Sequence, residues 1–274
     1  MDNRRFKLST VYMWFVFILL YLPIFYLIYY SFNAGGTMTE FTGFTWEHYQ
    51  TLFSDSRLMS FLMNTLIVAL LSAFIATLIG TFGAIAIYFT RSRQQRTSLL
   101  NLNNVLMVTP DVMMGASFLI LFSLVVPNQF GFWTVLLSHV AFSIPIVVLM
   151  ILPRLYEMNR NMITAAKDLG ANDSQILSRI IIPSIWSGII SGFFMAFTYS
   201  LDDFAVTFFV TGNGFSTLAV EIYSRARMGV SLEINALSTL MFIMALLLVL
   251  GYYYIQVGES RRKARKLRAE KAVL

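Results

Sequence analysis

Three acidic residues interrupt long apolar stretches of this 274-residue chain: Asp111, Asp202 and Asp203. A carboxylate at the centre of a membrane helix costs about 2.5–3.5 kcal/mol, so such groups usually face a protein interior or a water-filled path. All three are acids, which favours a cationic solute as the missing charge partner. Pro110 predicts a break in the helix beside Asp111, where polar backbone groups become available. We therefore predict Asp111 and the Asp202–Asp203 pair as residues of a substrate path for a cation.

Each acidic group also has a structural alternative. Thr109-Pro110-Asp111 is the pattern of a restarting helix, in which Asp111 offsets the positive end of the helix dipole. The pair at 202–203 also suits a membrane interface, where an outer vestibule would solvate both carboxylates. Because adjacent residues of a helix point about 100° apart, we expect at most one of the pair to face the path.

Two tyrosines, Tyr21 and Tyr199, are further candidates for the substrate path. Aromatic faces attract alkylammonium groups by ~0.5–2 kcal/mol, and both rings lie in apolar stretches. Aromatic residues make up 15% of the chain, so packing or lipid contact is the alternative for each. His139, next to Ser138, is expected to form an interhelical hydrogen bond rather than to relay protons.

Composition places these residues in an integral membrane protein. Hydrophobic residues make up 57% and charged residues 12% of the chain, whereas soluble domains carry about 25% charged residues. The sequence contains no cysteine and 2 histidines, so no metal cluster, cofactor or cysteine chemistry is expected. It lacks the G-x-x-x-x-G-K-[ST] pattern, so we expect that this chain does not bind ATP by a P-loop and is not an enzyme.

Six apolar stretches are long enough for the ~20 residues that a membrane helix needs. They cover about 11–31, 62–89, 98–126, 131–152, 184–210 and 236–257. The first is too long for a signal peptide and lacks a small-residue cleavage site, so we expect it to be retained. No internal repeat is visible. The pattern predicts one all-α domain, 1–274, with six transmembrane helices.

The basic residues orient this domain. With both termini in the cytoplasm, seventeen of the 20 Lys and Arg residues lie inside, and Arg57, Arg225 and Arg227 lie outside. Positive residues resist translocation, so we expect a multi-pass plasma-membrane protein with cytoplasmic N- and C-termini. The basic C-terminal tail is then explained by orientation and by contact with anionic membrane lipid, and no nucleic acid is expected as a partner.

The longest inner connection, about 153–183, has the pattern of a helix–turn–helix. Its less polar residues repeat at helical spacing, and Gly170 supplies the left-handed residue that ends a helix. Asn172 and Gln175 form a capping pattern for a second helix, which is expected to run until Pro183 interrupts its hydrogen bonds. The element either docks another protein or lies on the lipid surface as an amphipathic helix.

Residues 164–183 resemble the EAA loop of ABC importer permeases, in which E-A-A-x-x-x-G is followed by I-x-L-P. The matching segments are Thr164-Ala165-Ala166-Lys167-Asp168-Leu169-Gly170-Ala171 and Ile180-Ile181-Ile182-Pro183, with Thr164 where the family has Glu. The resemblance implies the type I permease fold with a coupling helix–turn–helix that docks on a cytoplasmic ATP-hydrolysing subunit. The residues that it assigns to this coupling are Ala165, Ala166, Lys167, Asp168, Gly170 and Pro183.

Other segments resemble the PotC-type permeases of spermidine/putrescine importers. They are Asn64-Thr65, Thr109-Pro110-Asp111, Ser138-His139 with Pro145, Leu201-Asp202-Asp203, Phe209-Val210-Thr211-Gly212, Gly229-Val230-Ser231 and Glu233-Ile234-Asn235-Ala236-Leu237. The resemblance implies a polyamine importer of the bacterial inner membrane that works by alternating access. Its implied partners are a cytoplasmic ATPase dimer that binds ATP-Mg, a second homologous permease chain and an extracytoplasmic polyamine-binding protein.

Three other functions compete with this interpretation. An ABC importer permease for another cationic or amino-acid-like solute would keep every feature except the substrate. A secondary transporter would run without ATP and usually shows an inverted repeat. A membrane-embedded enzyme would need a catalytic constellation. Spermidine and putrescine themselves demand the same residue types.

Overall fold

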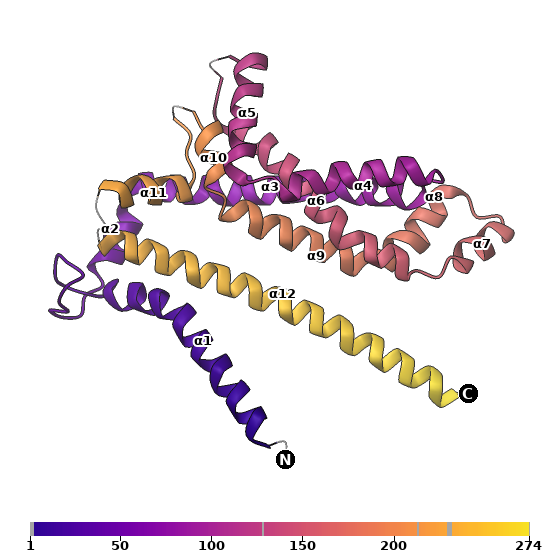
Figure 1. Ribbon diagram of the computed structural model, residues 1–274, viewed down its shortest axis with the longest axis horizontal. Coiled ribbons are helices and arrows are strands. Elements are labelled where there is room, and N and C mark those ends of the chain that lie inside the picture. The colour runs from indigo at the N-terminus through magenta and orange to yellow at the C-terminus, as the bar shows by residue number, and fades with distance from the viewer. Residues whose placement is uncertain (1–2, 128, 213, 229–231, 274) are drawn as a thin grey trace. The chain divides into compact units, whose positions relative to one another are not determined.

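The chain folds into helices joined by short connections (Figure 1). The computed structural model describes residues 3–127, 129–212, 214–228 and 232–273. The predicted resemblance segment Gly229-Val230-Ser231 lies outside the described residues. The contacts divide the chain into two compact units, which are described separately. Unit 1 comprises residues 1–60 and 221–248, and unit 2 comprises residues 61–220 and 249–274.

Five helical stretches in the described part of the chain are long and apolar enough to cross a membrane. They are α1 (Asn3–Tyr30), α3 (Ser56–Phe89), α6 (Phe132–Glu157), the run from Asp173 to Leu201 that ends with α9 (Ile182–Leu201), and α12 (Leu232–Val273). A sixth span follows if α4 (Arg93–Val108) and α5 (Asp111–Val125) count as one, although they are bent by 105°. The all-α architecture is confirmed, whereas one domain with six spans stays a prediction.

The shorter helices connect these stretches. They are α2 (Glu47–Ser54), α7 (Asn161–Asp168), α8 (Asp173–Ile176), a π-helical turn η1 (Leu177–Ile181), α10 (Ala205–Val210) and α11 (Leu218–Met228).

In unit 2, α6 packs on both α4 and α9 and runs opposite to them, and α5 turns sharply away from α4 beside α10 (Figure 1). α6 packs closely on α9 because glycines lie in their contact. A Cβ atom on Gly188 would lie 3.1 Å from the backbone oxygen of Met150, and one on Gly192 would lie 3.2 Å from Val147. Small residues let membrane helices approach closely.

The apolar core of unit 2 joins α3, α5, α6 and α10. Its buried members are Val68, Met114, Phe122, Val135, Phe142, Val206 and Val210. Tyr199 of α9 packs against this core. The short helix α10 is therefore held on the body of unit 2 by its own buried side chains, even though only one turn separates it from α9.

In unit 1, the loop after α1 is organised around the buried side chain of Asn33. Its Nδ2 atom donates to the backbone oxygens of Thr37 and Glu40 at 2.9 Å each, and its Oδ1 atom accepts from the backbone N–H of Thr42 at 2.9 Å. The backbone oxygen of Asn33 lies 2.8 Å from Nε2 of His48. Because one amide side chain satisfies several backbone groups, this loop has a defined structure.

Arg225 contacts three acidic side chains of unit 1. Its guanidinium lies 2.8 Å from the carboxylate of Glu221, 3.6 Å from Asp55 and 3.7 Å from Glu233. Asp55 also accepts a hydrogen bond from the backbone N–H of Arg57 at 2.9 Å. The three carboxylates therefore tie α11 to the starts of α3 and α12 through a single cation.

The connection between α6 and α9 contains the predicted helix–glycine–helix. α7 ends at Asp168, Gly170 has φ +81°, and Asn172 and Gln175 form the reciprocal capping box that opens α8. The prediction that Pro183 ends the second helix is wrong. Pro183 lies in the first turn of α9, directly after the π-helical turn η1. The helical run continues past it to Leu201. A wider turn removes the need for the N–H that proline lacks.

Candidate functional site

Two helix breaks in unit 2 are linked by one hydrogen bond. α4 ends at Val108 and α5 begins at Asp111, while α9 ends at Leu201 and α10 begins at Ala205. The hydroxyl of Tyr199, near the end of α9, donates to Oδ1 of Asp111 at 2.9 Å. Since α5 also packs on α10, residues 88 positions apart in the chain meet at one place.

Asp111 opens α5 and keeps its side chain exposed. It stands in the first turn of α5, where a carboxylate offsets the positive end of the helix dipole. Its side chain is also exposed and accepts the bond from Tyr199. The Tyr199 ring meets the buried Phe142 edge to face, with centroids 4.9 Å apart. Packing therefore fixes the direction from which the hydroxyl reaches Asp111.

The two neighbouring acids, Asp202 and Asp203, have different environments. The carboxylate of Asp203 accepts from the backbone N–H of Val206 at 3.3 Å, and from the backbone N–H and the hydroxyl of Thr207 at 2.9 and 2.8 Å. Its side chain is only 8% exposed. Asp202 is exposed. The carboxylate of Asp203 thus uses its oxygens to accept hydrogen bonds from the start of α10, whereas the carboxylate of Asp202 is accessible to a ligand.

Asp111, Tyr199 and Asp202 form an acidic cluster in apolar surroundings. Asp202 follows Tyr199 by three residues, and the hydroxyl of Tyr199 donates to Asp111, so both carboxylates lie near the same tyrosine. Val108, at 80% exposure, and Val112 flank Asp111 with apolar surface. Two carboxylates in such surroundings favour a ligand that brings positive charge and apolar segments together.

His139 lies at the centre of a buried polar chain behind this cluster. It forms the interhelical hydrogen bonds predicted from the sequence: its Nδ1 atom lies 2.6 Å from the hydroxyl of Ser200 in α9, and its Nε2 atom lies 2.8 Å from that of Thr207 in α10. Ser72 of α3 extends the chain to Ser200 at 2.9 Å. The sequence did not single out these hydroxyl residues, since isolated Ser and Thr are common in apolar helices.

Tyr21, the remaining candidate for the substrate path, belongs to unit 1. Its ring meets Phe17, Phe25 and Phe242 with centroid separations of 6.5 Å each. These contacts give Tyr21 the aromatic packing that was the alternative to a path role. Asp111, Asp202, Asp203 and Tyr199 are the candidates that unit 2 brings together.

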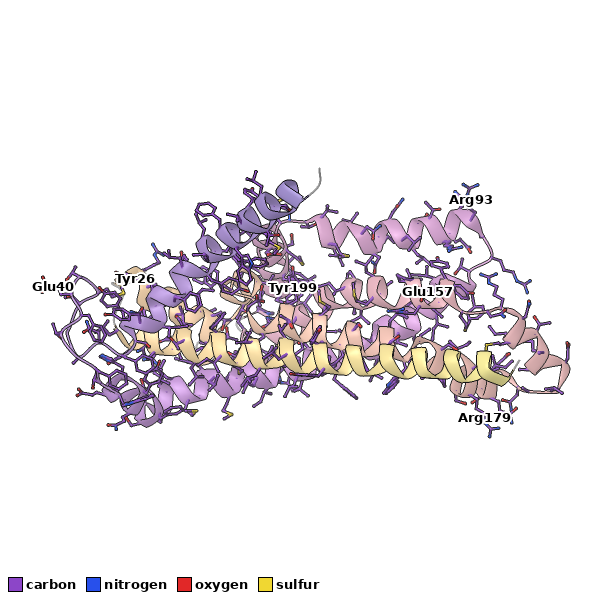
Figure 2. The ribbon with its side chains drawn as sticks, turned by 90° about the horizontal axis from the view of Figure 1, so that it is seen from below. Tyr26, Glu40, Arg93, Glu157, Arg179 and Tyr199 are labelled. Carbon is purple, nitrogen blue, oxygen red and sulfur yellow. The ribbon has the colours of Figure 1, made fainter. Side chains whose placement is uncertain are left out.

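The candidate coupling residues lie on and around α7. Ala165, Lys167 and Asp168 are exposed, and Leu169 is exposed to 89%. Lys167 lies 3.8 Å from the carboxylate of Asp173. Figure 2 shows Arg93, Glu157 and Arg179 toward the end of unit 2 that carries this connection, with Tyr199 well away from it. The element therefore presents small and apolar side chains at a charged end of the unit.

Arg160 anchors the start of α7 to the end of α3. Its Nε atom donates to the hydroxyl of Tyr88 at 2.8 Å, and its guanidinium lies 4.7 Å from the centroid of the same ring. Tyr156 packs on Tyr88 and forms a hydrogen bond with Arg96 of α4. Arg160 thus joins the connection to α3, and the bond between Arg96 and Tyr156 joins α4 to the end of α6.

Asn64 and Thr65, which carry part of the sequence resemblance, hold the loop before α11. Nδ2 of Asn64 donates to the backbone oxygen of Ser216 at 3.0 Å, and the hydroxyl of Thr65 accepts from the backbone N–H of Leu218 at 2.8 Å. These bonds connect α3 with residues more than 150 positions away. Their role is to position the chain that follows α10.

Comparisons with known proteins agree with this architecture. Residues 77–263 match the family model described as "Binding-protein-dependent transport system inner membrane component". The chain is 38% identical over 245 residues to the spermidine/putrescine transport system permease protein PotC of Haemophilus influenzae, covering 89% of this chain and 95% of that protein. It is 35% identical over 259 residues to the putrescine transport system permease protein PotI of Escherichia coli, covering 92% and 91%.

Solved structures show the same fold at lower identity. A chain of a bacterial ABC transporter for import of the polysaccharide alginate superposes with a TM-score of 0.75, at 17% identity, over 92% of this chain and 94% of that chain. A chain of the inward-facing MetNI methionine ABC transporter gives a TM-score of 0.59, at 19% identity, over 76% and 96%. The resemblance inferred from the sequence is confirmed. The chain belongs to the binding-protein-dependent transport system inner membrane components, as a multi-pass permease subunit of an ABC importer.

Proposed function

We propose that this chain is the permease subunit of an ABC importer that moves the polyamines spermidine and putrescine inward across the bacterial plasma membrane. The printed names of the relatives PotC and PotI, at 38% and 35% identity, support this substrate class. ATP-Mg is bound and hydrolysed by a separate cytoplasmic ATPase dimer. A polyamine-binding protein delivers the substrate from outside.

The observation that carries the proposal is the acidic cluster at the two helix breaks. A polyamine presents ammonium groups separated by methylene segments. The exposed carboxylates of Asp111 and Asp202 pair with ammonium groups, while the Tyr199 ring and apolar neighbours such as Val112 contact the methylenes. Asp203 serves the same site by holding α10 in place.

The transport cycle follows from where the breaks and the connection lie. Closure of the ATPase dimer pulls α7 and thereby moves α6 and α9, which pack on each other and lead to Asp202. The path opens outward, receives the polyamine, and returns inward after hydrolysis. Alternating exposure of one site through broken helices is a common arrangement in transporters.

The proposed assembly has a defined orientation. The whole chain, 1–274, acts as one transmembrane domain with six spans and with both termini in the cytoplasm, so that α7 and Leu169 face the ATPase. Six spans are too few to enclose a polar path comfortably, and a second homologous permease chain completes it. The basic C-terminal residues contact anionic lipid.

Uptake measurements test the substrate. Labelled spermidine and putrescine are offered to cells that lack this chain, complemented with wild type, Asp111→Asn or Gly170→Asp. Wild type is expected to restore uptake, and both variants to reduce it strongly. An Asp111→Asn variant that transports normally would leave Asp111 with its helix-dipole role alone. If wild type restores uptake of another cation but of neither polyamine, the family assignment survives and the polyamine assignment fails.

Cysteine labelling tests which acids face the path, because the native chain has no cysteine. Asp111→Cys, Asp202→Cys and Asp203→Cys are made singly in the complete transporter and treated with a cationic methanethiosulfonate reagent. Positions 111 and 202 are expected to react and to be protected by spermidine, and position 203 to react much more slowly. Val68→Cys, at a position that is 1% exposed, is the unreactive control. Equal labelling at 202 and 203 would contradict the assignment.

A further inference from the structure

His139 is buried in α6 yet uses both ring nitrogens. The residue is 1% exposed. Nδ1 lies 2.6 Å from the Ser200 hydroxyl, in the last turn of α9, and Nε2 lies 2.8 Å from the Thr207 hydroxyl, in the first turns of α10. Nε2 is also 3.5 Å from Oδ2 of Asp203. One side chain of α6 therefore holds both sides of the turn that contains Asp202.

The hydrogen-bond directions along this chain follow from counting protons. A carboxylate only accepts, and the single hydroxyl proton of Thr207 goes to Oδ2 of Asp203 at 2.8 Å. The Thr207 oxygen must then accept from Nε2–H of His139. In a neutral imidazole Nδ1 accepts, so Ser200 donates to it and in turn accepts from Ser72 at 2.9 Å. The buried chain is complete, with each partner satisfied.

The hydrogen bonds of His139 fix the conformation of the turn at residues 202–204. α9 ends at Leu201 and α10 begins at Ala205, and the Asp203 carboxylate caps α10 only because the helix starts anew there. A continuous helix would instead present Asp203 and Asp202 about 100° apart on one surface. Bonds from His139 to Ser200 and Thr207 fix both helix ends in the broken arrangement.

We infer that His139 is a positioning residue of the substrate path: through Ser200, Thr207 and Asp203 it keeps the turn between α9 and α10 open, so that Asp202 stays exposed beside Asp111. The inference rests on the function proposed above and assigns a residue that does not touch the substrate. On this inference, His139 of α6 determines that Asp202 is exposed to the substrate and that Asp203 holds the start of α10.

The alternative for a buried histidine in a transporter is proton relay. A relay needs contact with water at both ends, and neither end of this series of hydrogen bonds is open to water. Ser72, at its start, is fully buried, and Asp203, at its other end, is 8% exposed with its oxygens bonded to α10. A relay needs a group that titrates, whereas a positioning residue needs only a donor at the place of Nε2.

Substitutions at both ends of one hydrogen bond test the inference in the complete transporter. His139→Gln keeps a side-chain amide near the place of Nε2, and His139→Leu removes it. Thr207→Val removes the hydroxyl, and Thr207→Ser keeps it. Ser138→Ala is the matched control, since among the described residues this buried hydroxyl bonds only to the backbone oxygen of Thr134 in its own helix. Initial rates of labelled spermidine and putrescine uptake are compared at equal amounts of assembled complex.

His139→Leu and Thr207→Val are expected to reduce uptake at least tenfold. His139→Gln and Thr207→Ser are expected to stay within about threefold of wild type, a tenfold difference being about 1.4 kcal/mol. Labelling of Asp202→Cys by the cationic reagent does not depend on transport. In this variant, His139→Leu is expected to slow the labelling and His139→Gln to leave it unchanged. Ser138→Ala is expected to change neither measurement.

Three results would overturn the inference. His139→Leu with wild-type uptake and labelling would show that the bond positions nothing. His139→Gln as inactive as His139→Leu, with labelling at 202 unchanged in both, would favour proton relay. If His139→Leu does not accumulate in the membrane, Thr207→Val and Thr207→Ser decide, and equal uptake by these two would reject the inference. Wild-type complexes that take up neither polyamine reject the proposed function, and this inference with it.

Discussion

Two adjacent aspartates acquire opposite roles from the hydrogen bonds around them. Asp203 accepts three hydrogen bonds from the start of α10 and is nearly buried, while Asp202, three residues after Tyr199, is exposed. A carboxylate that is fully bonded to its own chain has little capacity left for a ligand. At the scale of single residues, environment decides function more strongly than residue type.

Asn substitutions should separate the two roles. Asp203→Asn replaces one acceptor oxygen with an NH2 group that cannot accept the hydrogen bonds from the start of α10. It should therefore lower the free energy of unfolding of the complex by about 1–2 kcal/mol. Asp202→Asn should leave stability unchanged and lower polyamine uptake about tenfold or more, because a charged hydrogen bond is worth about 1.5–3 kcal/mol. Thermal unfolding of the solubilised complex and initial uptake rates measure the two effects. The reverse assignment would be indicated if Asp202→Asn lowered the unfolding temperature and Asp203→Asn did not.

The connection carrying α7 combines a local turn with one long-range anchor. Gly170 ends the helix with φ +81°, and no side chain lies within 4 Å of where its Cβ would stand. Arg160 fixes the other end of α7 to Tyr88 by a hydrogen bond and by stacking over the ring. At the scale of elements, α7 is thus held at its base and leaves Leu169, next to its end, 89% exposed.

Substitutions at Gly170 should act through the backbone alone. Gly170→Asn should be tolerated because Asn enters the left-handed region readily, whereas Gly170→Val should cost about 1–2 kcal/mol or reshape the turn. Capture of the ATPase subunit by the permease complex, with uptake measured in parallel, tests this. Gly36→Val is the control, a position with open space and no left-handed φ. Equal binding by Gly170→Val and wild type would argue against a role for this turn in docking.

Tyr88 should matter for coupling rather than for docking. Tyr88→Phe keeps the ring beneath Arg160 and loses one hydrogen bond of about 0.5–1.5 kcal/mol, and Tyr88→Leu also loses the cation–π contact of about 0.5–2 kcal/mol. We expect the number of polyamines moved per ATP hydrolysed to fall in the order wild type, Tyr88→Phe, Tyr88→Leu. The ATPase should remain bound in all three. Loss of ATPase binding in Tyr88→Leu would instead make the anchor part of the docking surface.

Unit 2 is built so that movement of one helix reaches another. α6 lies against α9 at glycine contacts, and α9 leads to the turn that carries Asp202. A tightly packed pair cannot slide without moving its neighbour, since protein interiors have little free volume. At the scale of the whole molecule, the α6–α9 pair is the rigid connection between the α7 end of unit 2 and the acidic cluster.

Gly188 is the position at which this rigidity can be tested. A Cβ there would meet the backbone of Met150 at 3.1 Å and of Ile151 at 3.3 Å, so Gly188→Val should force the helices apart and cost about 1–3 kcal/mol. Gly83→Ala is the control, because its new Cβ would have 3.8 Å to the nearest atom, on Val148. Thermal unfolding of the complex measures both. Similar unfolding temperatures for Gly188→Val and wild type would contradict close packing of this pair.

The helical elements and their ends were predictable from the sequence because their causes are local. Runs of apolar residues mark the membrane helices, Pro110 marks the bend between α4 and α5, and Gly170 with Asn172 marks the turn beside α7. Pro110 lacks an N–H and Gly170 lacks a Cβ, whatever surrounds them. The family resemblance in residues 164–183 is local for the same reason, since it follows one surface element.

The assignment of the acidic residues was decided only by the tertiary structure. Asp111 meets Tyr199, and Ser72 meets Ser200, across more than 80 positions of the chain. Which of two adjacent aspartates is buried depends on such contacts, and no periodicity within a single segment encodes them. The continuation of the helix through Pro183 also became visible only in the structure, where a π-helical turn stands directly before the proline. Sequence sets what each segment can form, and packing between distant segments selects which side chains remain open to a substrate.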